Sequence, residues 1–176
     1  TIRRNPIDIA YSWYIRGWGD RFGVDPLSFV PAVKGKQIPI PTFAKNWGDK
    51  YKNMNNAERV VSSVLHLAKM EKANIEPHDL KLTVYYENLI TAPLSVVDDI
   101  SAFLIKKPHK SISNIIKKEC KGLDFEAQRV IKEKTLKDRM QNSVLFDKLK
   151  RYESYYISDC IKNSVSILNC TGSDQI

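Results

Sequence analysis

The sequence is most informative at residues 4–14, which read Arg4-Asn5-Pro6-Ile7-Asp8-Ile9-Ala10-Tyr11-Ser12-Trp13-Tyr14. Asn5 is a favourable helix N-cap, Pro6 suits the first helical position, and Asp8 at the third position can complete a capping arrangement. We therefore predict a helix from Pro6 to about Arg16. The Arg4 guanidinium then lies just before this helix, and the Ser12 hydroxyl lies two turns inside it.

Arg4 and Ser12 are suited to bind a phosphate. A planar guanidinium can bind phosphate oxygens with two hydrogen bonds, and a serine hydroxyl can add a neutral one. Because the helix rises about 9 Å between Pro6 and Ser12, Arg4 must fold back beside the helix for both to reach one phosphate. Pro6 has no N–H to offer and Asp8 repels an anion, so a phosphate would bind from the side. The alternative is a capped helix with an exposed arginine.

The next part of the chain divides into a long connection and a helix. From Gly17 to Asn53, four prolines and several glycines predict an irregular loop, and a loop of this length is usually functional. Asn55 or Asn56 then caps a helix that runs to about Lys72. Its buried face is predicted from spacing alone; His66 falls on the opposite side and is expected to face solvent. The predicted buried residues are Ala57, Val60, Val61, Val64, Leu65 and Ala68.

A strand, a loop and a helix follow. Residues Leu80 to Tyr86 alternate and are rich in β-branched and aromatic side chains, which predicts a strand. Pro93 begins a helix that ends near Lys107. This helix is expected to bury Leu94, Val97, Ile100, Phe103 and Leu104. Only one further strand end, Thr1 to Arg3, is visible, so we expect partner strands upstream of Thr1.

Composition restricts the class of protein and of partner. The 176 residues are 43% hydrophobic and 27% charged, as in an ordinary globular domain and unlike disordered, fibrous or membrane proteins. No apolar run approaches the roughly 18 residues of a membrane helix. Residues 106–151 hold 14 Lys and Arg against 6 Asp and Glu, which accounts for the whole net charge of +8. This surplus favours an anionic partner.

The C-terminal part of the chain is expected to be helical. Helix-compatible stretches cover about 111–119, 125–139 and 143–168, and 171–176 are a polar tail.

Two separate blocks resemble one known family. Arg-Asn-Pro-x-Asp-x-x-x-Ser followed by aromatic residues resembles the 3'-phosphate-binding motif of sulfotransferases that use 3'-phosphoadenosine 5'-phosphosulfate (PAPS). Residues 84–93, Val-Tyr-Tyr-Glu-Asn-Leu-Ile-Thr-Ala-Pro, and 100–104, Ile-Ser-Ala-Phe-Leu, look like the family's Tyr-Glu-Asp-Leu strand end, proline-started helix and closing Phe-Leu. Residues 13–23 are similar to bacterial-type members. The resemblance covers Thr1 to Lys107 well and the basic remainder loosely.

The resemblance implies a fold, a reaction and site residues. The fold would be an α/β, P-loop NTPase-like sulfotransferase fold, represented here by a mostly helical C-terminal half with one or two strands. The enzyme would transfer a sulfuryl group from PAPS, its co-substrate, to a hydroxyl or amine. Arg4 and Ser12 would bind the 3'-phosphate, Tyr86 would lie near the adenine, and Glu87 would be structural. Residues 1–170 would form a partial domain, with a motif-bearing part at 1–107, a basic helical part at 108–170 and a tail at 171–176.

The sequence also departs from the family. It has no Pro-x-Ser/Thr-Gly loop for the 5'-phosphosulfate and no histidine or glutamate in a family base position, so we assign no catalytic residue and expect this chain alone to be inactive. The C-terminal Arg-Lys-Gly of many members is missing. Lys117, Lys118 and Lys121 near Gly122 could supply comparable charge, although such a face is more often simply solvated. No metal ligands are predicted.

The acceptor and the compartment are less constrained. Nine of the 17 aromatic residues lie between Tyr11 and Tyr51; they suit an apolar, small-molecule or carbohydrate acceptor, or they anchor the long loop. Three widely spaced cysteines favour reduced thiols and the cytoplasm, whereas the sequon at residues 169–171 keeps a Golgi lumen open. Nothing predicts the oligomeric state.

Two other functions remain as alternatives. A non-catalytic basic module could bind nucleic acid or anionic lipid, but residues 106–151 lack the interleaved aromatics of a single-strand groove, so no nucleic acid is expected. A degenerate sulfotransferase-like domain could bind nucleotide without turnover.

Overall fold

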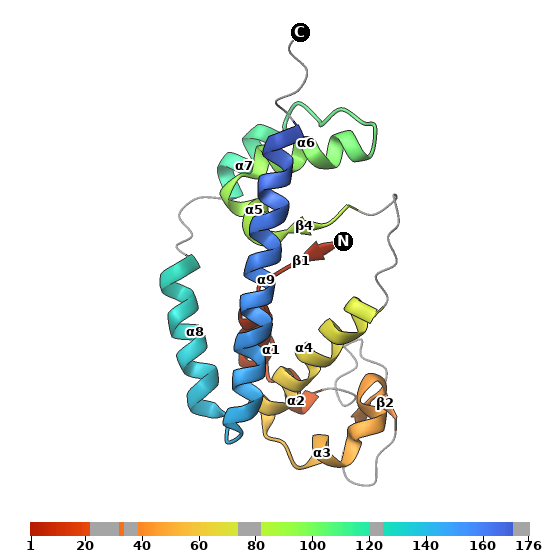
Figure 1. The fold of residues 1–176 in the computed structure, drawn as a ribbon, viewed down its shortest axis with the longest axis vertical. Coiled ribbons are helices and arrows are strands. Elements are labelled where there is room, and N and C mark those ends of the chain that lie inside the picture. Colours follow the sequence, from red (N-terminus) through yellow and green to blue (C-terminus); the bar gives the residue numbers. More distant parts are fainter. Residues whose placement is uncertain (22–31, 34–38, 74–81, 120–124, 171–176) are drawn as a thin grey trace. The chain divides into compact units, whose positions relative to one another are not determined.

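The computed structural model describes residues 1–21, 32–33, 39–73, 82–119 and 125–170. The fold is α-rich with few strands (Figure 1). Two compact units are each assembled from segments that are distant in sequence. Unit 1 takes the described residues of Thr1–Asn5, Glu76–Glu126 and Tyr155–Ile176, and unit 2 those of Pro6–Ile75 and Ala127–Ser154. The single partial domain over residues 1–170 stays a prediction.

Unit 1 contains a short parallel sheet. Strand β1 (Ile2–Arg3) pairs with β4 (Val84–Tyr85), with Ile2 opposite Val84 and Arg3 opposite Tyr85. The predicted strand end before Arg4 is therefore confirmed. The second strand is shorter than predicted, because Tyr86 already begins α5 (Tyr86–Thr91); Leu80 lies outside the described residues. Helices α6 (Pro93–Phe103), α7 (Ile112–Glu119) and the last part of α9 (Ser143–Cys170) complete the unit.

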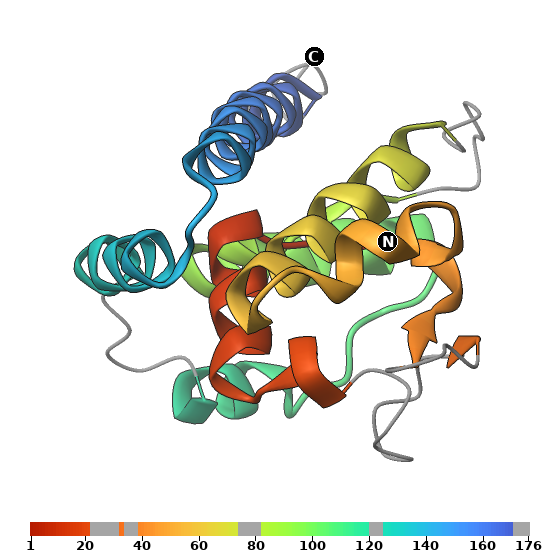
Figure 2. The same cartoon turned by 90° about the horizontal axis from the view of Figure 1, so that it is seen from below.

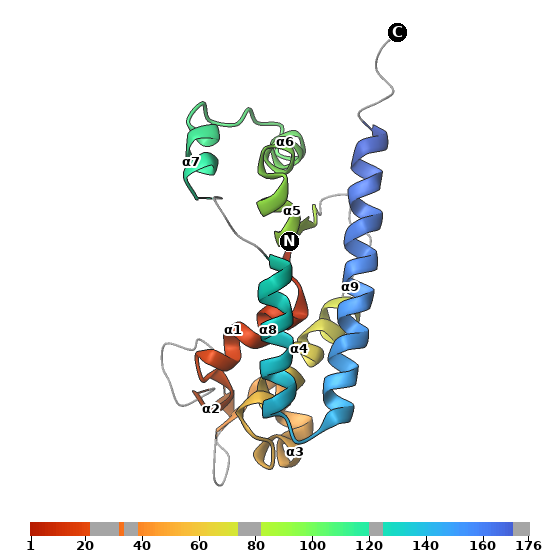
Figure 3. The same ribbon diagram turned by 90° about the vertical axis from the view of Figure 1, so that its left-hand side faces the viewer.

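Helix α6 matches only part of the face that was predicted to be buried. Val96, which was not predicted, is its buried residue; Val97 and Ile100 are half-buried, and Leu94, Phe103 and Leu104 are exposed. Val96, with Asp99 and Ala102, faces Val84 and its neighbours across a small cavity. The prediction failed because helical spacing defines an apolar stripe, while the position of the neighbouring strand decides which edge of that stripe is covered. The connection that follows α6 leads away from α5 to α7 (Figure 3).

Unit 2 is a helical unit with a small hairpin. It contains α1 (Pro6–Ile15), α2 (Trp18–Arg21), the antiparallel strands β2 (Ala32–Val33) and β3 (Ile40–Pro41), the 3-10 helix η2 (Thr42–Trp47), α3 (Gly48–Lys52), α4 (Asn56–Ala73), α8 (Phe125–Arg139) and the start of α9. Helices α1 and α4 lie side by side (Figure 2). The core is formed by Ile7, Ala10, Val60, Val61, Val64, Leu136, Phe146 and Leu149. The predicted helices are confirmed, and on the predicted face of α4 Ala57, Val60, Val61 and Val64 are buried while Leu65 and Ala68 are half-buried.

Helix α4 begins with a capping box. The Asn55 side chain accepts a hydrogen bond from Glu58 N–H at 3.0 Å, and Glu58 accepts one from Asn55 N–H at 3.1 Å. The other carboxylate oxygen of Glu58 accepts from the N–H groups of Gln141 (3.1 Å) and Asn142 (2.9 Å), between α8 and α9. One buried carboxylate therefore caps α4 and fastens it to the α8–α9 turn.

The long connection carries more structure than the prolines indicated. The described part of residues 17–53 holds α2, the β2–β3 hairpin, η2 and α3, while Pro26 and Pro31 lie outside the described residues. His66 does not face solvent as predicted. Its ring is half-buried, stacks on Phe43 at 6.0 Å and contacts Trp47 at 5.7 Å between centroids. The connection folds back over α4 and covers the face that helical spacing alone leaves open.

Candidate functional site

The candidate site lies where the two parallel strands of unit 1 end. Arg4 directly follows β1 and Tyr86 directly follows β4, and the register of Arg3 opposite Tyr85 brings the two residues to the same edge. The Arg4 guanidinium carbon lies 4.7 Å from the centre of the Tyr86 ring, a cation–π contact. The sequence predicted both residues as ligand contacts without predicting that they touch. Chain segments 82 residues apart meet here through strand pairing.

Arg4 has no acidic partner among the residues that the structure describes. Its side chain is half-buried, and its Nε is buried without a hydrogen-bond partner. A partly desolvated guanidinium that is stacked on a ring, and that no carboxylate neutralises, favours an anion beside it.

The neighbouring arginine is used differently. Arg3 Nη1 forms an ion pair with Asp159 Oδ2 of α9 at 2.9 Å, and the Tyr85 hydroxyl donates to the same oxygen at 2.5 Å. Burial, and then the hydrogen bond to Asp159, raise the pKa of Tyr85 to about 12. Arg3 therefore holds β1 to α9 inside unit 1. Of two consecutive arginines, one stabilises the fold and the other remains available.

Glu87 holds the backbone next to Arg4. One carboxylate oxygen accepts a hydrogen bond from Asn5 N–H at 3.0 Å, and the other accepts from the Tyr156 hydroxyl. Burial, and then the hydrogen bond to Glu87, raise the pKa of Tyr156 above its usual range. Asn5 is fully buried. These contacts support the structural role predicted for Glu87, and they restrain the direction in which Arg4 leaves the chain.

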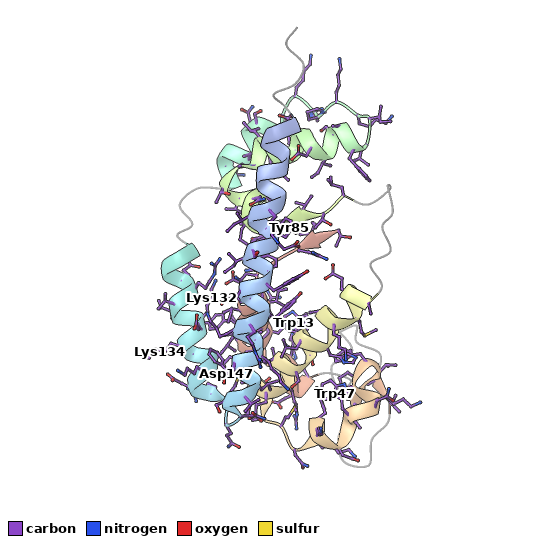
Figure 4. All side chains as sticks on the ribbon, viewed as in Figure 1. Trp13, Trp47, Tyr85, Lys132, Lys134 and Asp147 are labelled. Carbon is purple, nitrogen blue, oxygen red and sulfur yellow. The ribbon has the colours of Figure 1, made fainter. Side chains whose placement is uncertain are left out.

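Asp8 does not complete the predicted cap of α1. It is 3% exposed and forms an ion pair at 2.6 Å with Lys132. Lys132 lies on α8 (Figure 4). The Asn5 N–H that a capping acid would accept is donated to Glu87 instead. The prediction failed because α8, more than 100 residues along the chain, brings a cation to the buried carboxylate. The negative charge that the sequence places near Arg4 is therefore compensated within unit 2.

Ser12 lies on α1 in unit 2 and is half-buried. Arg4 belongs to unit 1. Their contact with one shared phosphate stays a prediction.

Several described aromatic residues of unit 2 pack on one another. The rings of Trp13 and Trp18 lie 5.3 Å apart, and those of Trp47 and Tyr51 lie 5.6 Å apart, between centroids. Trp13, Trp18, Phe43 and Trp47 pack against the buried Ala44 and Tyr51. These contacts favour the anchoring of the connection over an acceptor-binding wall.

Unit 1 also contains a cavity that no sequence feature predicted. Its volume is about 240 Å³, and it lies between β4, α5 and α6. Burial, and then the neighbouring Asp98, raise the pKa of Asp99 at its edge. The lining is otherwise mostly apolar and consists of Leu82, Thr83, Val84, Tyr85, Asn88, Val96, Asp99 and Ala102.

Some of the lysines in the basic stretch, residues 106–151, form ion pairs with acidic residues of the same chain. Lys132 pairs with Asp8, and Lys150 pairs with Glu133 at 2.7 Å and with Glu153 at 2.5 Å. The predicted charge donor Lys118 is exposed on α7. The side chain of Lys117, together with Lys121 and Gly122, lies outside the described residues. A continuous nucleic-acid-binding surface is therefore not favoured.

The comparisons with family models, with curated proteins and with solved structures found no match. None of the described helices combines the length and apolar content that crossing a bilayer requires. In the described part of the chain, no three His, Cys, Asp or Glu side chains gather as a metal site would.

Proposed function

We propose that this chain forms the 3'-phosphate and adenine side of a PAPS-binding site in a sulfotransferase with a P-loop NTPase-like α/β fold. The observation that carries the proposal is Arg4, which is stacked on Tyr86 at the ends of two parallel strands and lacks an acidic partner among the described residues. In open α/β sheets, ligands bind beyond the carboxyl ends of the strands.

The charge of the surroundings supports an anionic ligand at Arg4. The nearest acids in sequence are Asp8, which is paired with Lys132, and Glu87, which accepts hydrogen bonds from Asn5 and Tyr156. Neither carboxylate is an ion-pair partner of Arg4. A 3'-phosphate would supply the oxygens that a guanidinium binds with two hydrogen bonds, and the Tyr86 ring would hold the guanidinium plane in place.

The reaction transfers a sulfuryl group in line from donor to acceptor. The bond between sulfur and the bridging phosphate oxygen breaks, a bond from sulfur to the acceptor oxygen or nitrogen forms, and the acceptor proton passes to a base. Adenosine 3',5'-bisphosphate leaves. Arg4 and Ser12 would anchor the 3'-phosphate, and Tyr86 would lie beside the adenine. We assign no catalytic base in these residues, and we expect the 176-residue chain to bind the bisphosphate without turning over PAPS.

Isothermal titration with adenosine 3',5'-bisphosphate and with 5'-AMP tests the site. Arg4→Ala should weaken bisphosphate binding by about 1.5 to 3 kcal/mol, because a charge-assisted contact is lost, and should leave 5'-AMP binding nearly unchanged. Arg16→Ala, at an exposed arginine beyond α1, is the matched control and should change neither affinity. Equal losses for both nucleotides would refute the assignment of Arg4 to the 3'-phosphate.

A double-mutant cycle tests whether Ser12 contacts the same group. Ser12→Ala alone should cost about 0.5 to 1.5 kcal/mol of bisphosphate affinity. If both side chains bind one phosphate, the double variant should depart from additivity by about 0.5 kcal/mol or more. Strict additivity would show that Ser12 does not share the phosphate with Arg4.

A further inference from the structure

The end of α6 exposes three consecutive apolar side chains. Phe103 is 41% exposed, Leu104 57% and Ile105 89%. We call these three residues the apolar tip. They end α6 and begin the connection to α7 (Figure 3). Burying such side chains in unit 1 would have stabilised the fold, so their exposure is unfavourable unless they are used elsewhere.

Ile105 is also strained. Its φ is 51°, in the left-handed region that β-branched residues avoid. Ile105 N–H donates to Ala102 O at 3.1 Å and Lys106 N–H donates to Ser101 O at 2.9 Å, the two hydrogen bonds of a Schellman helix end. Glycine is the usual residue at this position. The isoleucine therefore costs backbone energy and, being almost fully exposed, recovers nothing by packing within the described part of unit 1.

The residues that follow the apolar tip carry positive charge and no acidic side chain as far as Lys118. Between residues 100 and 118 there are five lysines and no acidic residue. Lys106, Lys107, Lys110 and Lys118 are exposed. The nearest acids along the chain are Asp98 and Asp99, earlier on α6, and Asp99 faces the cavity beside β4. Exposed apolar side chains among lysines match the two components of an anionic bilayer surface.

We propose that the apolar tip inserts into the headgroup region of an anionic lipid bilayer while the lysines around it bind the headgroups. Apolar burial and attraction to anionic lipid together produce such peripheral binding. Nucleic acid is a poorer fit, because only Phe103 of the three tip residues could stack on a base and the stretch contains no arginine. A second copy of the chain would bring two lysine-rich surfaces together. The inference is independent of nucleotide binding at Arg4.

Co-sedimentation with vesicles tests the proposal on the 176-residue chain. We expect binding to mixed phosphatidylserine and phosphatidylcholine vesicles, and little binding to phosphatidylcholine alone. The variant Ile105→Gly should weaken binding about tenfold, because an apolar side chain is lost. It removes the backbone strain at the same time, so unfolding would not explain the loss. Lys106→Gln with Lys107→Gln should weaken binding about 25-fold, at about fivefold per lysine.

The matched control is on α8. Ile131 is 64% exposed and lies near exposed Lys134 in unit 2; Ile131→Ser with Lys134→Gln should leave vesicle binding unchanged. Three results would overturn the proposal: equal binding to both vesicle types, a loss of vesicle binding in the α8 control as large as that in the tip variants, or no vesicle binding at all. Two further results would overturn the proposal, both with vesicle binding unchanged in the tip variants. In the first, these variants no longer bind an RNA or DNA duplex; in the second, they no longer self-associate in analytical ultracentrifugation.

Discussion

The two units differ in whether their charged side chains are paired within the fold. In unit 2, buried acids are fully used: Asp8 pairs with Lys132, Glu58 caps α4 and binds the α8–α9 turn, and Glu153 pairs with Lys150. In unit 1, Arg3 is paired with Asp159, but Arg4 has no acidic partner among the described residues, and the apolar tip is exposed with Ile105 strained. The contrast indicates which groups stabilise the fold and which are available to ligands and surfaces.

The largest expected effect tests the claim that charge in unit 2 is structural. Asp8→Ala removes a carboxylate that is 3% exposed and leaves Lys132, 15% exposed, without its ion-pair partner. Breaking a buried ion pair in this way should lower the free energy of unfolding by about 3 to 5 kcal/mol. Urea denaturation measures the change. The double variant Asp8→Leu with Lys132→Met should recover most of the loss, and a single variant as stable as the parent would contradict the assigned role.

A stabilising change is expected in unit 1. Ile105→Gly removes left-handed strain of about 1 to 2 kcal/mol, and the greater freedom of unfolded glycine offsets about 0.5 to 1 kcal/mol. The free energy of unfolding should therefore rise by about 1 kcal/mol, since almost no buried surface is lost. Urea denaturation of the parent and the variant under the same conditions shows whether the free energy of unfolding rises or falls. A destabilised variant would mean that Ile105 packs against something in the folded chain.

The burial of Tyr85, and then its hydrogen bond to Asp159, predict a dependence of stability on pH. Because the pKa of Tyr85 is raised from 10.0 to about 12, the folded state retains a proton that the unfolded state loses. The stabilisation is complete below pH 10 and is lost as the pH rises toward 12. The unfolding free energy, measured by urea denaturation between pH 9 and 12, should fall less steeply for Tyr85→Phe than for the parent. Parallel curves would contradict the role of the Tyr85 hydroxyl.

The smallest expected effect concerns the ring beneath Arg4. Tyr86→Ala removes the cation–π contact and should weaken binding of adenosine 3',5'-bisphosphate by about 0.5 to 1 kcal/mol. Tyr86→Phe retains the ring and should bind nearly as well as the parent. Titration calorimetry on the pair distinguishes ring stacking from a hydroxyl contact. If phenylalanine were as harmful as alanine, the hydroxyl and not the stacked ring would be the important group.

Local features of the fold were predictable from sequence. Helix α1 was predicted at Pro6 to Arg16 and extends over Pro6–Ile15, and the buried face of α4 follows its apolar spacing. Predictions failed where a distant segment intervened. Phe43 of the long connection stacks on His66. Asp8 forms an ion pair with Lys132 and does not complete the predicted cap. Helix α6 buries Val96, whereas the predicted Leu94 is exposed.

The candidate site, like the fold, was predictable from the sequence only in part. Arg4, Ser12 and Tyr86 were selected from two sequence motifs, yet no motif predicts that Arg4 touches the Tyr86 ring or that Glu87 binds the Asn5 backbone.

The sequence by itself determined where α1 and α4 begin and which residue types could bind a phosphate, because capping and helical periodicity act over a few neighbouring residues. Only the tertiary structure decided that Arg3 is paired with Asp159 while Arg4 has no such partner among the described residues. The physical reason is that the partner and the burial of a charge depend on segments that strand pairing and helix packing bring together from far along the chain.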